Sequence, residues 1–133
     1  MTGSMFWLIM TATMVAILWL PYTLDRIVVR GVFRTMGNPQ EGDAPLHDWA
    51  QRAYYAHTNA VENLVVFGVL VLVANAAGMG NDGAVVVWAG VFFYARLLHF
   101  VVYTAGIPVV RTLSYAAGWA ACIVIALRLI GVW

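Results

Sequence analysis

The chain has 133 residues, of which 63% are hydrophobic and only 10% are charged. A soluble domain is nearer half apolar and a quarter charged, so this composition predicts an integral membrane protein. The formal net charge is +1 and no basic run is present, which excludes nucleic acid as an expected partner, because that partner requires clustered phosphate contacts.

Four segments are apolar and long enough to cross a membrane, which takes about 20 residues. They cover, in chain order, about 5–33, 47–77, 83–105 and 109–131. We therefore expect an all-α integral membrane fold, a four-helix bundle in which residues 1–133 form one domain. The N-terminal stretch is expected to be the first span and not a cleavable signal, since it lacks a basic start and its apolar run is too long.

The first span begins MFWLIMTATMVAILWLPYTL and is predicted to bend at Pro21, because proline cannot donate the helical hydrogen bond. Its last part, DRIVVRGVFR, is amphipathic. Arg26, Arg30 and Arg34 recur there every four residues, which predicts that they share one helical face. A polar loop rich in Gly and Pro follows at 35–48.

The later connections are short. GMGND at 78–82 predicts a tight turn, so spans two and three should form an antiparallel hairpin. Gly106 and Pro108 separate spans three and four. Cys122 is the one cysteine, so no intrachain disulfide forms, and its apolar surroundings predict a small buried or lipid-facing residue.

Arginines flank the first and third loops, whereas the opposite side of the predicted bundle has only Arg128. By the positive-inside rule, loops one and three face the cytoplasm and both termini lie on the other side. All basic residues are arginine, and the chain is rich in Ala, Val and Gly. This composition suits a bacterium with GC-rich DNA, and hence a bacterial inner membrane.

Three predicted spans each carry a stripe of polar residues. The stripes are Arg52, Tyr55, Asn59, Glu62 and Asn63, with His57 to one side; Arg96, His99 and Tyr103; and Arg111, Ser114, Tyr115 and Gly118. A charged group inside a bilayer costs about 2.5–3.5 kcal/mol on insertion scales, so these groups predict a polar site between helices. A structural ion pair between Glu62 and Arg96, with Asn59 as interhelical glue, is the simpler alternative.

The predicted site has arginine forks suited to carboxylates, a carboxylate suited to an ammonium, and amides suited to peptide groups. A small zwitterionic peptide such as glutathione matches this set. An arginine at a helix start also favours a thiolate, since lowering a thiol pKa from ~8.5 by two units takes ~2.7 kcal/mol. No HExxH motif, cysteine cluster or carboxylate-rich set is present, so no metal is expected.

Span two contains RAYYAHTNAVENLVVF, span three contains ARLLHFVVY and span four contains RTLSYAAG, while Asn38 and Pro39 lie in the first loop. Together these patterns resemble those of the MAPEG family, the membrane-associated proteins in eicosanoid and glutathione metabolism. The resemblance covers nearly the whole chain. It implies a four-helix bundle that forms a homotrimer, with glutathione as co-substrate bound at subunit interfaces toward the cytoplasmic side.

The resemblance also implies roles for individual residues. Arg111 matches the arginine credited with stabilising the thiolate, and Tyr115 or Thr112 is the expected additional hydrogen-bond donor. The expected glutathione contacts are Arg30, Arg52, His57, Asn59, Glu62, Arg96, His99 and Tyr103. Tyr55 stands where the family usually has an arginine, and Arg52, one turn earlier, is the expected substitute.

The sequence thus predicts a membrane glutathione transferase, with or without peroxidase activity, that acts on hydrophobic electrophiles dissolved in membrane lipids. One alternative is a non-catalytic membrane protein of the same fold that binds lipid or serves as a scaffold. Another is a small transporter with Glu62 and His57 as a proton relay, although the chain lacks the paired broken helices typical of transporters.

Overall fold

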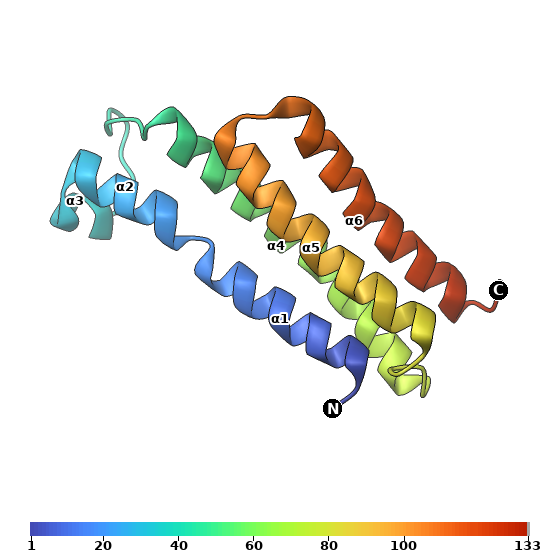
Figure 1. Ribbon diagram of the computed structural model, residues 1–133. Helices are drawn as coiled ribbons and strands as arrows, with labels where there is room; N and C mark the ends of the chain where they lie inside the picture. The colour runs from blue at the N-terminus through green and yellow to red at the C-terminus, as the bar shows by residue number, and fades with distance from the viewer. Residues whose placement is uncertain (133) are drawn as a thin grey trace.

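The computed structural model describes residues 1–132 and consists of helices that run side by side (Figure 1). The helices are α1 (Gly3–Ile17), α2 (Leu20–Arg30), α3 (Val32–Met36), α4 (Asp48–Ala76), α5 (Gly83–Ala105) and α6 (Pro108–Leu129). The described part of the chain contains no strand. Four units, namely α1 with α2, then α4, α5 and α6, are each long and apolar enough to cross a membrane. The predicted four-span helical bundle is confirmed.

Helix α5 lies at the centre of the bundle and packs against α1, α4 and α6. Alanines on α4 at positions 50, 53, 56 and 60 are buried, and their small side chains allow α1 and α5 to approach closely. Nearer the termini, Phe67 of α4 stacks on Phe92 of α5 with ring centroids 4.0 Å apart. Cys122 is buried in the same apolar cluster, in agreement with one of its two expected positions.

The first span bends where the sequence predicted. Helix α1 ends at Ile17 and α2 begins at Leu20, with Pro21 in the first turn of α2. His57 of α4 supports this bend, because its Nε2 donates to the carbonyl of Val15 at 3.1 Å. The hydroxyl of Tyr22 in turn donates to Nδ1 of His57 at 2.8 Å.

The first span ends earlier than predicted, at Arg30 and not at residue 33. Gly31 has φ 81° and ψ 161°, a conformation essentially restricted to glycine, and it interrupts the helix. Arg34 therefore lies on α3 and does not continue the helical face of Arg30. The predicted single arginine stripe is wrong, although the fold brings the same residues together by another route.

Gly31→Ala should destabilise the protein, because alanine at this φ and ψ is strained by about 1–3 kcal/mol. No atom lies within 4 Å of a Cβ added at Gly31, so the cost would be conformational and not steric. The thermal unfolding midpoint of the detergent-purified protein should fall. Gly83→Ala is the matched control, since that site is equally open but lies in the first turn of α5 without a positive φ. Equal midpoints for the two variants would contradict the Gly31 conformation.

The turn between α4 and α5 forms the predicted antiparallel hairpin. Asp82 caps α5, because its Oδ1 accepts from the backbone N–H groups of Ala84 and Val85 at 3.1 and 3.2 Å. Arg128 of α6 bonds the same carboxylate at 2.7 Å, and this hydrogen bond holds the pKa of Asp82 below its usual range. The turn and α6 are thereby tied together.

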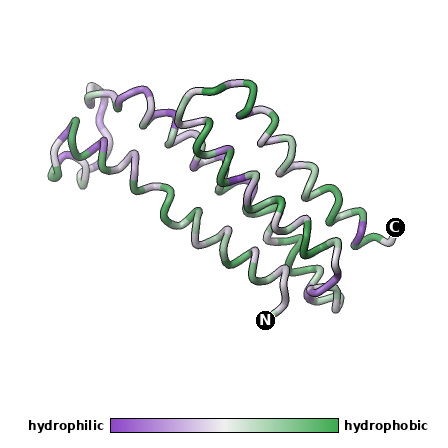
Figure 2. The backbone as a smooth tube through the Cα atoms, in the orientation of Figure 1, coloured by the Kyte–Doolittle hydropathy of each residue, from purple (hydrophilic) through white to green (hydrophobic). Residues whose placement is uncertain are grey.

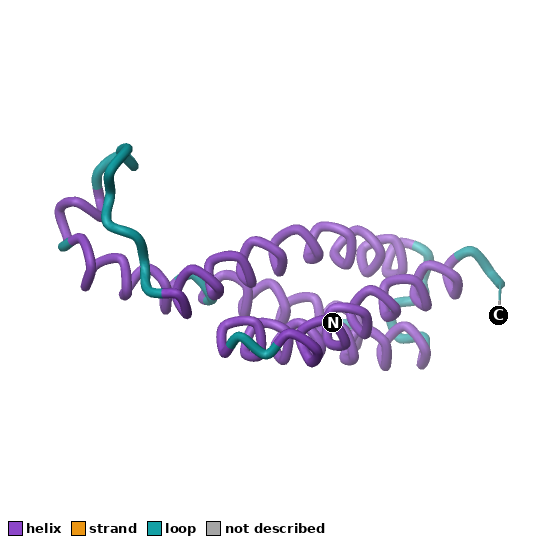
Figure 3. Tube along the Cα trace, turned by 90° about the horizontal axis from the view of Figure 1, so that it is seen from above, coloured by secondary structure: helices purple, strands orange, loops and turns teal. Residues whose placement is uncertain are grey.

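Polar residues gather toward the other end of the bundle, which carries α2, α3 and the start of α4 (Figure 2). The two termini lie at the opposite end, on either side of the bundle (Figure 1). The loop that joins α3 to α4 stands out from the helices when the molecule is seen from above (Figure 3).

Candidate functional site

A cavity of about 220 Å³, here called the polar cavity, lies where α4, α5 and α6 meet. Its lining consists of Asn59, His99, Tyr103, Arg111, Thr112 and Tyr115. All six residues were predicted site residues, and the structure brings them together from three helices. The cavity lies close to the α5–α6 connection, since Tyr103 is near the end of α5 and Arg111 near the start of α6.

Arg111 is one turn inside the N-terminal end of α6, which Pro108 begins. The unpaired N–H groups and the dipole of a helix start both favour an anion nearby. The guanidinium carbon of Arg111 lies 4.7 Å from the ring centroid of Tyr103. Within residues 1–132 this guanidinium has no carboxylate partner, so its charge remains available to a ligand.

Arg96 is buried directly behind the cavity, with 1% of its surface exposed. Its Nη1 donates to Oδ1 of Asn59 at 3.2 Å, and its Nη2 donates to the carbonyls of Ser114 and Tyr115, each at 3.0 Å. Gly118 makes this position possible, because an added Cβ would lie 2.6 Å from Nη2 of Arg96. All these partners are neutral. A second unpaired positive charge therefore lies at the site.

His99 is 4% exposed and presents an unused hydrogen-bond acceptor. Its Nδ1 lies 3.0 Å from the carbonyl of Arg111 and is assigned as the protonated nitrogen. Its Nε2 is buried without a hydrogen-bond partner, as is the Nε donor of Arg96. Buried polar atoms are nearly always paired, so an unpaired acceptor and an unpaired donor beside one cavity indicate a polar ligand.

The two hydroxyl groups expected to assist Arg111 differ in availability. The Thr112 hydroxyl donates to the carbonyl of Pro108 at 3.1 Å, so its proton is already engaged. Tyr115 is 41% exposed, and its phenol makes no hydrogen bond within the described chain. Tyr115 is therefore the hydroxyl donor that the geometry leaves free.

The family model of MAPEG matches residues 5–131. The chain belongs to the MAPEG family. No curated protein matches the chain closely enough to count as a relative. Membership of MAPEG, together with the four apolar spans, establishes an integral membrane helical bundle and supports a glutathione or eicosanoid type of function at the level of the family.

Two predicted contacts of this MAPEG chain lie away from the polar cavity. His57 supports the bend of the first span, and both its ring nitrogens are engaged there. Arg30 lies beyond the bundle, where its Nε donates to the carbonyl of Ala44 at 2.7 Å and its Nη1 is 3.4 Å from Asp43. Both were predicted as glutathione contacts, and their contact with a ligand stays a prediction; the sequence alone did not reveal these intramolecular partners.

Arg52 and Glu62, both on α4, are also absent from the lining. The Nε of Arg52 donates to the carbonyl of Thr104 at 3.0 Å and so caps the end of α5. Glu62 is exposed and has no partner within residues 1–132. The alternative ion pair between Glu62 and Arg96 does not form. A proton relay from Glu62 to His57 is not supported either, since His57 faces α1 and Glu62 faces outward.

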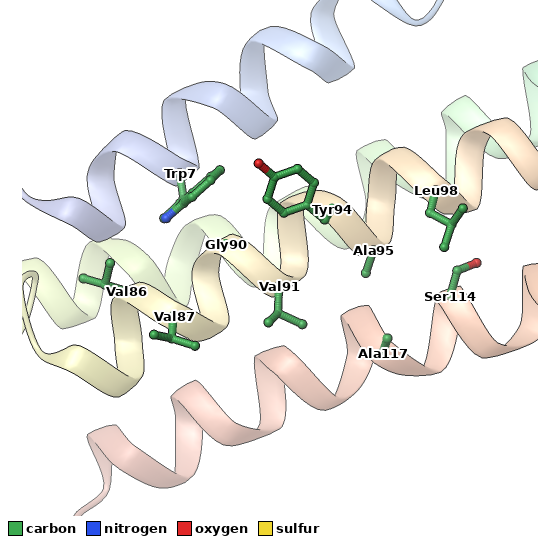
Figure 4. A pocket seen from close by; sticks show the side chains of 10 residues that line it. All are labelled: Trp7, Val86, Val87, Gly90, Val91, Tyr94, Ala95, Leu98, Ser114 and Ala117. Carbon is green, nitrogen blue, oxygen red and sulfur yellow. The ribbon is translucent and has the colours of Figure 1, made fainter.

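A second, larger cavity of about 640 Å³ was not predicted from the sequence (Figure 4). This apolar groove follows α5 between α1 and α6, and its lining is Trp7, Val86, Val87, Gly90, Val91, Tyr94, Ala95, Leu98, Ser114 and Ala117. Ser114 connects it to the polar cavity, because its hydroxyl donates to the carbonyl of Arg111 at 2.9 Å and lies 3.3 Å from Nδ1 of His99.

Proposed function

We propose that the protein is a membrane glutathione transferase that conjugates glutathione to hydrophobic electrophiles, with or without peroxidase activity. The observation that carries this proposal is the pair Arg96 and Arg111. Arg111 lines the polar cavity and Arg96 lies behind it, bonded to the lining residue Asn59, and neither arginine has a carboxylate partner in the described chain. Two uncompensated arginines at membrane depth are costly and call for an anionic ligand.

The residues at the cavity fit glutathione by chemical type. Its two carboxylates and its thiolate suit the guanidinium groups of Arg96 and Arg111. Its N–H groups suit Nε2 of His99, which lacks a donor. Its amides suit the side chain of Asn59. When bound, glutathione supplies the sulfur nucleophile that forms the new bond to the electrophile.

Arg111 has the principal role in activation. Its charge and the start of α6 favour a thiolate over a thiol, so the thiol proton passes to water at the polar end of the bundle. The Tyr115 phenol donates a hydrogen bond toward the same space, and Tyr103 holds the Arg111 guanidinium in place by stacking. The apolar groove provides a route from the lipid for the second substrate, since Ser114 lines the groove and contacts His99 and Arg111 of the polar cavity.

We also propose the homotrimer that the family resemblance implies. Glu62 supports it, because an exposed, unpartnered carboxylate within a span is costly unless another subunit covers it. Glu62 would then contact the ligand ammonium from a neighbouring subunit. The arginine distribution supports loops one and three facing the cytoplasm of a bacterial inner membrane, with the termini opposite.

A non-catalytic lipid-binding protein is the second candidate function. The observation that favours it is the size of the apolar groove, about 640 Å³ against about 220 Å³ for the polar cavity. One experiment on the detergent-purified protein, which measures glutathione binding, turnover and retained lipid, distinguishes the two functions. Saturable glutathione binding with turnover of a hydrophobic electrophile supports the transferase, whereas retained lipid with no response to millimolar glutathione supports the alternative.

Filling the apolar groove should impair large substrates selectively. Ala117 is exposed and lines the groove, so Ala117→Phe adds bulk there without displacing a buried neighbour. Its KM for a long-chain electrophile should rise roughly tenfold, since about 1.5 kcal/mol of apolar burial is lost. KM for a small aromatic electrophile should change little. Ala116→Phe is the matched control, because Ala116 is also exposed but does not line the groove. If both variants raised the KM for the long-chain electrophile equally, the groove would not be the binding site of this substrate.

A further inference from the structure

A third cavity, of about 310 Å³, lies between α2, α3 and the loop after α3, at the end of the bundle where that loop stands out (Figure 3). We call the segment that these elements form, residues 20–47, the arm. The cavity lining is Arg26, Arg30, Arg34, Thr35, Gly37, Pro39 and Asp43. None of these residues lines the polar cavity or the apolar groove.

The lining of this cavity has an excess of positive charge. It contains three arginines and one aspartate. Asp43 organises the loop, because it accepts from Nε of Arg34 at 2.6 Å and from the backbone N–H of Gln40 at 3.0 Å. The Gln40 and Arg34 hydrogen bonds hold the pKa of Asp43 below its usual range, so it stays charged near neutral pH. It offsets only one of the three positive charges.

Arg26 is the arginine of the arm that has no acidic partner among residues 1–132. Its guanidinium carbon lies 5.9 Å from the ring centroid of Tyr22. Its Nε is buried without a hydrogen-bond partner, and so is the hydroxyl of Thr35. An arginine fork and a threonine hydroxyl beside one cavity are donors suited to a phosphate group.

The outer surface of the arm is apolar and exposed. The exposed fractions are 60% for Leu24, 79% for Val28, 52% for Val32, 92% for Phe33 and 80% for Met36. A helical segment with arginines on one side and such residues on the other, at the end of a membrane span, suits the boundary between headgroups and acyl chains. A phosphate at that depth belongs to a lipid.

We propose that the arm binds the headgroup phosphate of an anionic phospholipid, with the acyl chains lying along the apolar surface at Phe33 and Met36. Arg26, Arg34 and Thr35 would donate to the phosphate. A zwitterionic headgroup fits less well, because its ammonium would meet the positive excess of the cavity. Within one chain this site shares no lining residue with the polar cavity, and the proposal does not rest on glutathione binding.

The test uses the full chain purified in detergent, and native mass spectrometry to count bound lipids. Phosphatidylglycerol should be retained in preference to phosphatidylcholine with the same acyl chains. Arg26→Gln should weaken phosphatidylglycerol retention about fivefold, the factor expected for one basic residue near an anionic headgroup. Arg128→Gln, the same substitution at the opposite end of the bundle, should not.

Two further variants test the site without removing an arginine. Thr35→Val removes only the hydroxyl and should also weaken retention. Asp43→Asn keeps an oxygen for the Gln40 N–H while removing the competing charge, so it should strengthen retention. The proposal is overturned by equal retention of the two lipids, or by unchanged retention in all three arm variants. Displacement by equimolar inorganic phosphate would indicate a soluble anion instead, and displacement by glutathione would assign the arm to the transferase site.

Discussion

Arg111→Ala is expected to remove most of the thiolate of the bound peptide while leaving the fold intact. An arginine and a helix start that lower a thiol pKa from ~8.5 by about two units contribute ~2.7 kcal/mol, so if most of this is lost the thiolate fraction at pH ~7 should fall from about three quarters to a few per cent, roughly 25-fold. Arg111 bonds neighbouring residues through its backbone and only stacks through its side chain, so truncation removes few structural contacts. Ultraviolet absorbance of the thiolate during glutathione titration measures the effect.

Two control variants distinguish charge from geometry in this experiment. Arg128→Ala removes an arginine from the other end of α6, where it pairs with Asp82, and should leave the thiolate signal unchanged. Arg111→Lys retains the charge but loses the planar fork, so a partial signal is expected. A full signal in Arg111→Ala would assign thiol activation to another group at the cavity.

The helical spans and most of the candidate site could be predicted from the sequence. In a membrane helix a polar side chain is costly toward lipid, so polar residues at helical spacing show which faces meet. That argument placed Asn59, His99, Tyr103 and Arg111 at one cavity, and the structure confirms their proximity. Pro21 predicted the bend of the first span by the same kind of local chemistry.

The hydrogen-bond and ion-pair partners of individual polar side chains could not be predicted in the same way. Arg30 and His57 have side chains suited to a ligand, yet Asp43 binds the first and the Val15 carbonyl and Tyr22 bind the second. These partners come from segments distant in sequence, so helical spacing does not reveal them. The arginine spacing in DRIVVRGVFR likewise suggested a continuous helix, and only the positive φ of the intervening glycine shows that the chain turns.

The apolar groove required information that no sequence pattern contained. Its walls come from α1 and α6, which lie on either side of α5, and its volume depends on how far these helices stand apart. Small residues such as Gly90 and Ala117 occur in it, but small residues also permit close helix packing. Their presence alone therefore does not distinguish a groove from a tight contact.

Arg96→Met should weaken glutathione binding without destabilising the protein. Arg96 is buried with neutral partners only, and replacing buried charge by an apolar residue of similar volume is often neutral or stabilising. Loss of a hydrogen bond to a charged group costs about 1.5–3 kcal/mol, so the glutathione Kd should rise roughly ten- to hundredfold. Calorimetric titration and the thermal unfolding midpoint, measured on the same preparation, give the two quantities.

Gly118→Ala tests the same arginine without removing it. A Cβ at this position would lie 2.6 Å from Nη2 and 2.7 Å from Nε of Arg96, so the guanidinium must move and lose its bonds to the Ser114 and Tyr115 carbonyls. Glutathione should bind more weakly here too, but the displaced charge remains buried, so the unfolding midpoint should fall. If Arg96 instead served only to stabilise the fold, Arg96→Met would lower the unfolding midpoint as well. Opposite stability effects with the same loss of binding would show that the buried charge is retained for the ligand at a cost to the fold.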